Sequence, residues 1–151
     1  MVNLGDGVTG EARDVASEHA RLALEAYRAG RRMAILSGGE LEVTVRHRAG
    51  RGGRSQEYAL ALAVALAGHP GIAAIAADTD GIDGGDGATG DPAGAFALPS
   101  TLAAAKDRHL DAKNFLDDND ASTFFAPIGG LLVRGPTHTN VNDFRAILID
   151  P

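Results

Sequence analysis

A glycine-rich cationic loop at the start of a predicted helix is the strongest candidate for chemistry in this sequence. The stretch "GRGGRSQE" covers residues 50–57 and leads into the apolar run "YALALAVALAG". Glycine lets backbone approach a ligand closely, and the first turn of a helix presents unpaired N–H groups that attract anions. We therefore predict an anion site centred on Arg54, with contributions from Gly52, Gly53, Gln56 and Glu57. The alternative is a solvated loop arginine.

A second polar motif, "SGGE", follows an apolar run that is typical of a buried strand. The backbone N–H groups of Gly38 and Gly39 could form an anion nest, with Ser37 and Glu40 beside them. A pair of glycines is equally typical of a hairpin turn, and the motif taken alone favours the turn.

The longest irregular stretch is the acidic loop "DTDGIDGGDGATGDPAG", which begins at Asp78. Asp80 and Asp83 are candidate Mg²⁺ ligands, because this ion needs only one or two carboxylates when substrate phosphate and water complete its shell. The loop does not match an EF-hand, since Ile82 occupies a ligand position. The alternative is a set of Asx turns that stabilise the loop itself.

A fourth loop, "GPTHTNVND", follows a predicted strand near the end of the chain. Thr137, Thr139, Asn140 and Asn142 could bind a ribose, a phosphate or a carboxylate, or could satisfy loop backbone groups. Each of the four loops follows a predicted strand. Ligands of α/β proteins bind at strand ends, where loops converge, so we expect these loops to meet at one site.

Hydrophobic periodicity predicts the elements that must position these loops. A helix capped by Thr9 ends at Gly30, and a second helix runs from Ser55 to Ala67. Strands are predicted at 32–40, 41–48, 72–78, 130–135 and 144–150, and further helical segments between 100 and 129. Strands alternate with helices, which indicates the α/β class with a mixed sheet. We expect a three-layer sandwich forming a single domain over residues 1–151.

Composition excludes several classes of function. The chain has 151 residues and a formal net charge of −6, which argues against a nucleic-acid partner. No apolar stretch reaches membrane-spanning length, and the first residues lack a signal-peptide pattern. The absence of cysteine excludes disulfides, thiolate metal sites and a thiol nucleophile. We expect a cytoplasmic protein without membrane partners.

Several stretches together resemble the C-terminal (MOFRL) domain of the glycerate 2-kinase family, whose members are often labelled hydroxypyruvate reductases. The matching stretches follow the family's order: "LGDGVTGEAR", "LSGGE", "GRGGRSQEYALALA", "DTDGIDG", "AGA", "NDAS..FF" and "GPTHTNVNDFRAILI". They cover nearly the whole chain. The sequence departs from the family at His138, where glycine is usual.

The resemblance implies an enzyme that phosphorylates D-glycerate with ATP and Mg²⁺ in a cleft between a Rossmann-like N-terminal domain and this domain. It implies that Arg54 contacts the transferring phosphoryl group or the glycerate carboxylate. The N-terminal domain, expected to supply a catalytic lysine, would be the partner, so we expect the chain alone to be inactive. A homo-oligomer is compatible with the sequence. The alternatives are part of a hydroxypyruvate reductase and a stand-alone module that binds a small anion or a partner.

Overall fold

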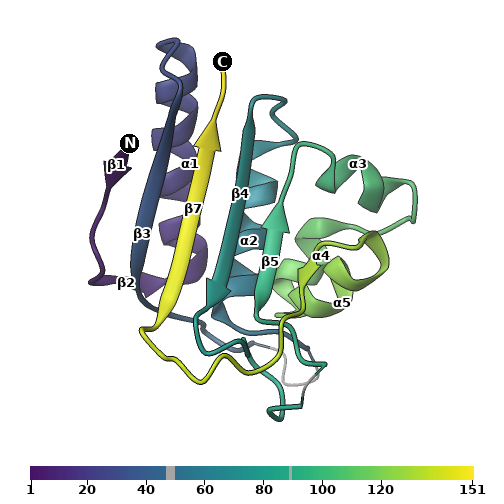
Figure 1. The fold of residues 1–151 in the computed structure, drawn as a ribbon. Helices are drawn as coiled ribbons and strands as arrows, with labels where there is room; N and C mark the ends of the chain where they lie inside the picture. Colours follow the sequence, from purple (N-terminus) through teal and green to yellow (C-terminus); the bar gives the residue numbers. More distant parts are fainter. Residues whose placement is uncertain (47–49, 89) are drawn as a thin grey trace.

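The computed structural model describes residues 1–46, 50–88 and 90–151. Its seven-stranded sheet has the order β1-β3-β7-β4-β5-β6, with β2 also paired to β3 (Figure 1). The strands are β1 (Val2–Asn3), β2 (Val8–Glu11), β3 (Met33–Glu42), β4 (Ile72–Asp78), β5 (Gly94–Ala97), β6 (Leu131–Leu132) and β7 (Asp143–Ile149). The helices are α1 (Ala12–Arg28), α2 (Arg54–Leu66), α3 (Thr101–Lys106), α4 (Ala112–Asp117), α5 (Ala121–Phe125) and the 3-10 turn η1 (Ala126–Ile128).

The topology brings the ends of three central strands to one edge of the sheet. Strand β7 lies between β3 and β4 and is antiparallel to both, so β3 and β4 run parallel to each other. Helix α2 connects them, and its first turn lies at the edge where β3 and β4 end and β7 begins (Figure 1). In this register, Asp143 is paired with Asp78 on one side and with Gly39 on the other. The convergence of loops predicted from the sequence therefore occurs for the loops after β3 and β4.

Helix α2 is the central helix of the packed layer. It contacts α1, the sheet and α4 and α5, and most of its residues are buried. Helix α1 packs with a stripe of buried alanines, Ala12, Ala16, Ala20, Ala23 and Ala26, whose small side chains allow close approach. Because α2 is enclosed in this way, the position of its first turn, which carries Arg54, is fixed by packing.

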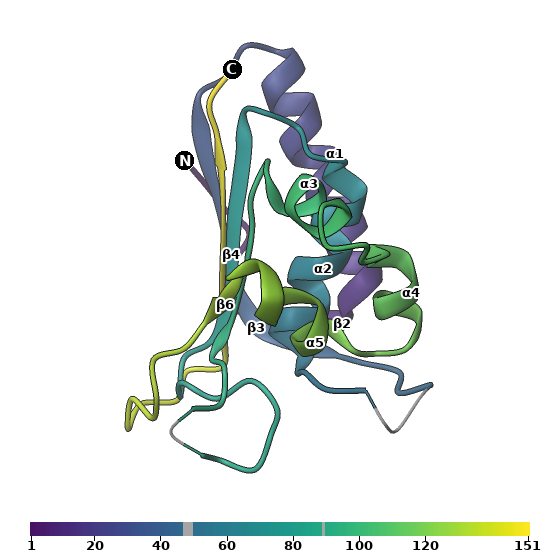
Figure 2. The same ribbon diagram turned by 90° about the vertical axis from the view of Figure 1, so that its right-hand side faces the viewer.

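The mixed α/β class and the single domain are confirmed. All the helices in the described part of the chain lie on one face of the sheet, as Figure 2 shows. The expected three layers are therefore two layers in these residues. Strands that are apolar on both faces predict a layer of helices on each face of the sheet. The helices at residues 1–46, 50–88 and 90–151 cover only one of the two faces.

Three local predictions are corrected by the structure. The "SGGE" stretch is not a hairpin, because β3 runs unbroken through it to Glu42 and residues 43–46 form no further strand. Gly39 (φ 103°) permits this course, since a Cβ there would lie 2.2 Å from the Val8 carbonyl oxygen of the adjacent β2. Helix α1 begins after Glu11 instead of Thr9. Residues 94–97 form β5, a strand that the sequence prediction omitted.

Candidate functional site

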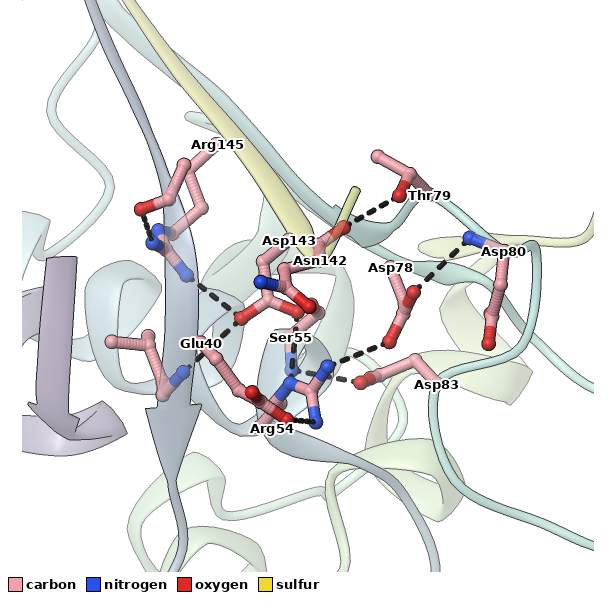
Figure 3. A network of polar contacts seen from close by, with 12 residues as sticks. Glu40, Arg54, Ser55, Asp78, Thr79, Asp80, Asp83, Asn142, Asp143 and Arg145 are labelled. Carbon is pink, nitrogen blue, oxygen red and sulfur yellow. Dashed lines mark hydrogen bonds and ion pairs between the residues drawn. The ribbon is translucent and has the colours of Figure 1, made fainter. Parts of the chain in front are cut away.

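Arg54 is the centre of a polar cluster at the converging edge of the sheet (Figure 3). Its Nε donates to Asp143 Oδ1 at 2.8 Å, and its Nη2 donates to Asp78 Oδ2 at 2.9 Å. Its Nη1 donates to Glu40 Oε1 at 3.1 Å. The Asp143 and Asp78 side chains are 0% and 8% exposed, whereas that of Glu40 is 60% exposed. The guanidinium is thus held on two sides by buried carboxylates and on the third by one that reaches it from solvent.

Asp143 links Arg54 to a second arginine inside the fold. Its Oδ2 accepts from Arg145 Nη1 at 2.9 Å and from the backbone N–H of Leu41 at 3.3 Å. Arg145 is 1% exposed and also donates to Ser37 Oγ and to the Gly38 carbonyl. A carboxylate with this many donors is well compensated for its burial. Its position, and through it that of Arg54, is therefore tightly set.

Burial and neighbouring charges shift the pKa values of the ionisable groups in this cluster. Burial opposes the charged form of Arg54, yet the hydrogen bond and charge of Asp143, with Asp78 and Glu40, raise its pKa. Burial raises the pKa of the Asp78 carboxyl, against the hydrogen bond from the Asp80 backbone N–H. Burial lowers the pKa of Arg145, which Asp143 opposes. Arg54 therefore remains a cation, and its surroundings are rich in negative charge.

The anion at the N-terminus of α2 belongs to the protein itself. Asp83 Oδ1 accepts from the Ser55 N–H at 2.9 Å, and Oδ2 accepts from the Gln56 N–H at 2.7 Å. The Gln56 side chain donates to the Asp83 carbonyl. Ser55, predicted as the cap, lies in the first turn, and the N-cap is Gly53. Glycine is required at 53, because a Cβ would lie 2.4 Å from Asp83 Oδ1.

A pocket of about 720 Å³ opens beside Arg54. Its wall includes Gly52 and Gly53 from the predicted loop, with Asp78 and Asp83 from the acidic loop. Leu41, Val43 and Ile82 add apolar surface. The Arg54 side chain is 26% exposed, so an anion in the pocket can reach it. The structure thus brings together Arg54, Glu40, Gly52, Gly53 and Asp83 from the predicted set.

Other predicted residues have structural partners away from Arg54. Glu57 lines the pocket but is ion-paired to Arg13 of α1 at 2.6 Å and accepts from Asn119 Nδ2. Ser37 and Gly38 bind Arg145 through their oxygen atoms, and Gly39 packs on β2.

The loop before β7 is organised by contacts within itself and with Thr79 of the acidic loop. Thr137 Oγ1 donates to the Thr79 carbonyl, and the Thr139 N–H donates to Thr137 Oγ1. Asn140 Oδ1 accepts from the Asn142 N–H, and the Asn142 carbonyl accepts from Thr79. These contacts match the alternative in which short polar side chains satisfy loop backbone. None of these four side chains lines the pocket beside Arg54.

The carboxylates predicted to hold Mg²⁺ are engaged elsewhere in this arrangement. Both oxygens of Asp83 accept backbone N–H groups, and burial raises the pKa of its carboxyl to about 6, against those hydrogen bonds. Asp80 Oδ1 accepts from the Ile82 N–H, which forms an Asx turn. Within the described residues, no group of three or more His, Cys, Asp or Glu side chains is arranged to hold a metal ion. In this structure the two carboxylates therefore stabilise the acidic loop and the start of α2, and Mg²⁺ binding by them stays a prediction.

Sequence reasoning missed three residues of the cluster, namely Asp78, Asp143 and Arg145. Asp78 ends one predicted strand and Asp143 directly precedes another, and these positions were the available signal. Their proximity depends on the pairing of β4 with β7, more than sixty residues apart in the chain. His47 and Arg48, the last residues of the strand predicted at 41–48, and Ala49 lie outside the described residues.

Comparison with known proteins identifies the family. The family model described as "MOFRL family" matches residues 33–143, which is most of the chain. This chain belongs to the MOFRL family. A protein of Agrobacterium vitis named "Putative hydroxypyruvate reductase" is 49% identical over 97% of this chain, and the D-glycerate 2-kinase of Thermotoga maritima is 42% identical over 77%. The crystal structure of Thermotoga maritima glycerate kinase matches 97% of the chain with a TM-score of 0.90 and 35% identity.

This MOFRL chain is shorter than the proteins it matches. It spans 34% of the Agrobacterium vitis protein, 27% of the Thermotoga maritima kinase sequence and 35% of the crystallised chain. No helix in the described part of the chain is long and apolar enough to span a membrane.

Proposed function

We propose that this chain is the C-terminal domain of a glycerate kinase, which transfers a phosphoryl group from ATP to a hydroxyl of D-glycerate. The observation that carries the proposal is the setting of Arg54, a cation on a pocket wall whose third carboxylate partner, Glu40, is largely exposed. The reaction class is supported by relatives that are named glycerate kinases. The remainder of the active site belongs to the N-terminal domain that we expect in the complete enzyme.

In this proposal Arg54 binds the substrate anion in place of Glu40. Asp143 and Asp78 engage Nε and Nη2, which leaves donors on the Nη1 side of the guanidinium. An exposed ion pair such as Arg54–Glu40 contributes only about 0–1 kcal/mol, so a glycerate carboxylate or phosphoryl oxygen can displace it. The Glu40 carboxylate therefore stands where the substrate anion binds.

The two buried aspartates prepare Arg54 for this task. Phosphoryl transfer depends mostly on positioning and on neutralising charge, and a donor that is already fixed needs no reorganisation when the charge develops. ATP supplies the phosphoryl group, and the residues of this chain that could contact it are Arg54 and the backbone of residues 50–53. Three carboxylates surround Arg54. Binding a polyanion therefore requires further cations, which we assign to the N-terminal domain.

The first test compares the chain alone with the chain joined to a partner domain. The partner is the upstream region, meaning the part of the Agrobacterium vitis relative that this chain does not match and that we expect to precede it. ADP release with D-glycerate and ATP is the readout. We expect no turnover from either piece and turnover from the two together. Turnover by the pure chain alone, or none from a folded complex, would contradict the proposal.

The second test asks what Arg54 does in the active complex. Arg54→Lys keeps the charge but loses the planar fork, so we expect kcat to fall about a hundredfold, as for loss of a contact of roughly 3 kcal/mol. Glu40→Gln removes the competing anion and should lower KM for glycerate. Arg51→Lys on the same loop is the matched control and should resemble the parent. If Arg54→Lys raises KM and leaves kcat unchanged, Arg54 binds the substrate equally strongly in the ground state and in the transition state.

The names of two Agrobacterium vitis relatives favour a second candidate, a hydroxypyruvate reductase. The stretch "GDGVTG" at residues 5–10 has the G-x-G-x-x-G spacing, but its second half lies in strand β2 and does not open a helix as a dinucleotide-binding motif does. This activity would therefore require the upstream region to bind NADH or NADPH. Loss of NADH or NADPH absorbance with hydroxypyruvate, without ADP formation in the kinase assay, would replace the kinase proposal with this one.

A further inference from the structure

The face of the sheet opposite the helices is apolar and exposed. We define the outer apolar face by six residues from β4, from β5 and the residue after it, and from β7: Ala73, Ile75, Phe96, Leu98, Ala146 and Leu148. None of them is charged or polar. Leu148 is 59% exposed and Leu98 is 44% exposed. Figure 2 shows the sheet edge-on, with the helices on one side and no helix on the side of this face.

The alternation of side chains along β7 shows that both faces are built for burial. Arg145, Ile147 and Ile149 point to the helices and are buried, while Phe144 and Leu148 point away and are exposed. Strands that are apolar on both faces are typical of a sheet with a layer on each side. Apolar residues gathered on neighbouring strands, in contrast to residues scattered singly, are the kind of exposed surface at which a partner can pack.

The face has a hollow that suits projecting side chains. A cavity of about 220 Å³ lies over the small residues Ala73 and Ala146, with Phe96 and Leu148 among the larger residues of its wall. On the opposite face, the isoleucines of β3, β4 and β7 share one buried core with the alanines of α1 and α2. The outer apolar face thus offers small residues beside large ones, which can receive the side chains of a helix.

The size of the patch favours a layer of the same protein over a second copy of this chain. The residues that define the face span three strands about 4.8 Å apart and three positions of about 3.4 Å along each strand, which gives a patch of roughly 150 Å². Stable complexes between separate proteins bury about 800 Å² per partner. Two helices about 10 Å wide, side by side, would cover the width of the patch. A covalently connected layer does not lose the translational freedom that association costs.

We propose that helices of the N-terminal domain pack on the outer apolar face and form the third layer. The matched proteins supply the length of chain that this requires, since this chain spans only about a third of each. The face also continues into the site, because Phe144, 45% exposed, directly follows the Asp143 that holds Arg54. A domain that covers the Arg54 pocket is therefore placed to extend onto the sheet. This inference rests on the proposed function for the identity of the partner.

Cysteine labelling tests the proposal cleanly, because the chain has no cysteine of its own. Leu148→Cys places one thiol on the outer apolar face, and Ala146→Cys is a second variant with a smaller change. Glu18→Cys, on the exposed side of α1, is the matched control. Each variant is labelled alone and co-expressed with the upstream region defined above. We expect labelling at 146 and 148 to slow at least tenfold in the complex, and labelling at 18 to stay unchanged.

Other outcomes overturn the inference in distinct ways. If the upstream region does not bind, it is not the partner of this face. If it binds but labelling at 146 and 148 is not slowed, it docks on another surface of the chain. Protection that grows with the concentration of the chain alone, together with a dimer in sedimentation, assigns the face to a second copy. Labelling does not depend on turnover. A complex in which labelling is slowed but no turnover occurs therefore refutes the proposed kinase activity and not the docking. A complex that turns over without slowed labelling refutes only the docking.

Discussion

Replacing Arg54 by methionine should destabilise the fold, and the size of the effect follows from its partners. The ion pair with exposed Glu40 contributes about 0–1 kcal/mol. The pairs with Asp78 and Asp143 matter more, because their carboxylates are 8% and 0% exposed and would lose a cation. Removing one partner of a buried pair costs about 3–5 kcal/mol. Asp143 keeps Arg145, and Arg54 is itself 26% exposed, so we take the lower end, about 3 kcal/mol.

Urea and thermal unfolding of the parent and the Arg54→Met variant measure this loss. A destabilisation of about 3 kcal/mol corresponds to a fall in Tm of roughly 6–12 °C for a domain of this size. The loss should shrink in acid, because burial raises the pKa of the Asp78 carboxyl and its protonated form no longer needs the cation. Arg51→Met, on the same loop, is the control and should change the free energy of unfolding by less than about 0.5 kcal/mol. An Arg54→Met variant as stable as this control would refute the reasoning.

Two further predictions concern the framework of the site. Burial raises the pKa of the Asp83 carboxyl from near 4 to about 6, so between these pH values the native state binds a proton that the unfolded state has released. Stability should therefore fall as pH rises through this window, by at most about 3 kcal/mol, and urea unfolding of Asp83→Asn should lack this fall. Gly39→Ala places a Cβ against the Val8 backbone in the left-handed region and should cost more than about 2 kcal/mol, whereas Gly7→Ala, where the space is open, should cost under about 1 kcal/mol. Equal unfolding midpoints for the two alanine variants would contradict this second prediction.

The sequence by itself determined the main elements and the residue at the centre of the site. Periodicity in "EARDVASEHARLALEAYRAG" and "YALALAVALAG" predicted α1 and α2, because a helix that packs on one side repeats its apolar residues every three to four positions. The apolar runs at 72–78 and 144–150 predicted β4 and β7. Glycine followed by arginine at the start of α2 indicated Arg54. These signals are local, so a single sequence contains them.

Only the tertiary structure decided which groups Arg54 meets. Asp78 and Asp143 become neighbours through the pairing of β4 with β7, and the sequence does not encode the register of strands so far apart. The acidic loop turns back so that Asp83 accepts N–H groups at the start of α2. Before β7, Thr137 binds the backbone of Thr79 in the acidic loop, and Asn140 binds the backbone of its own loop. A buried backbone N–H must find a partner within the fold. Loop side chains that looked available for a ligand were therefore used by the protein itself, and this choice depends on distances that exist only after folding.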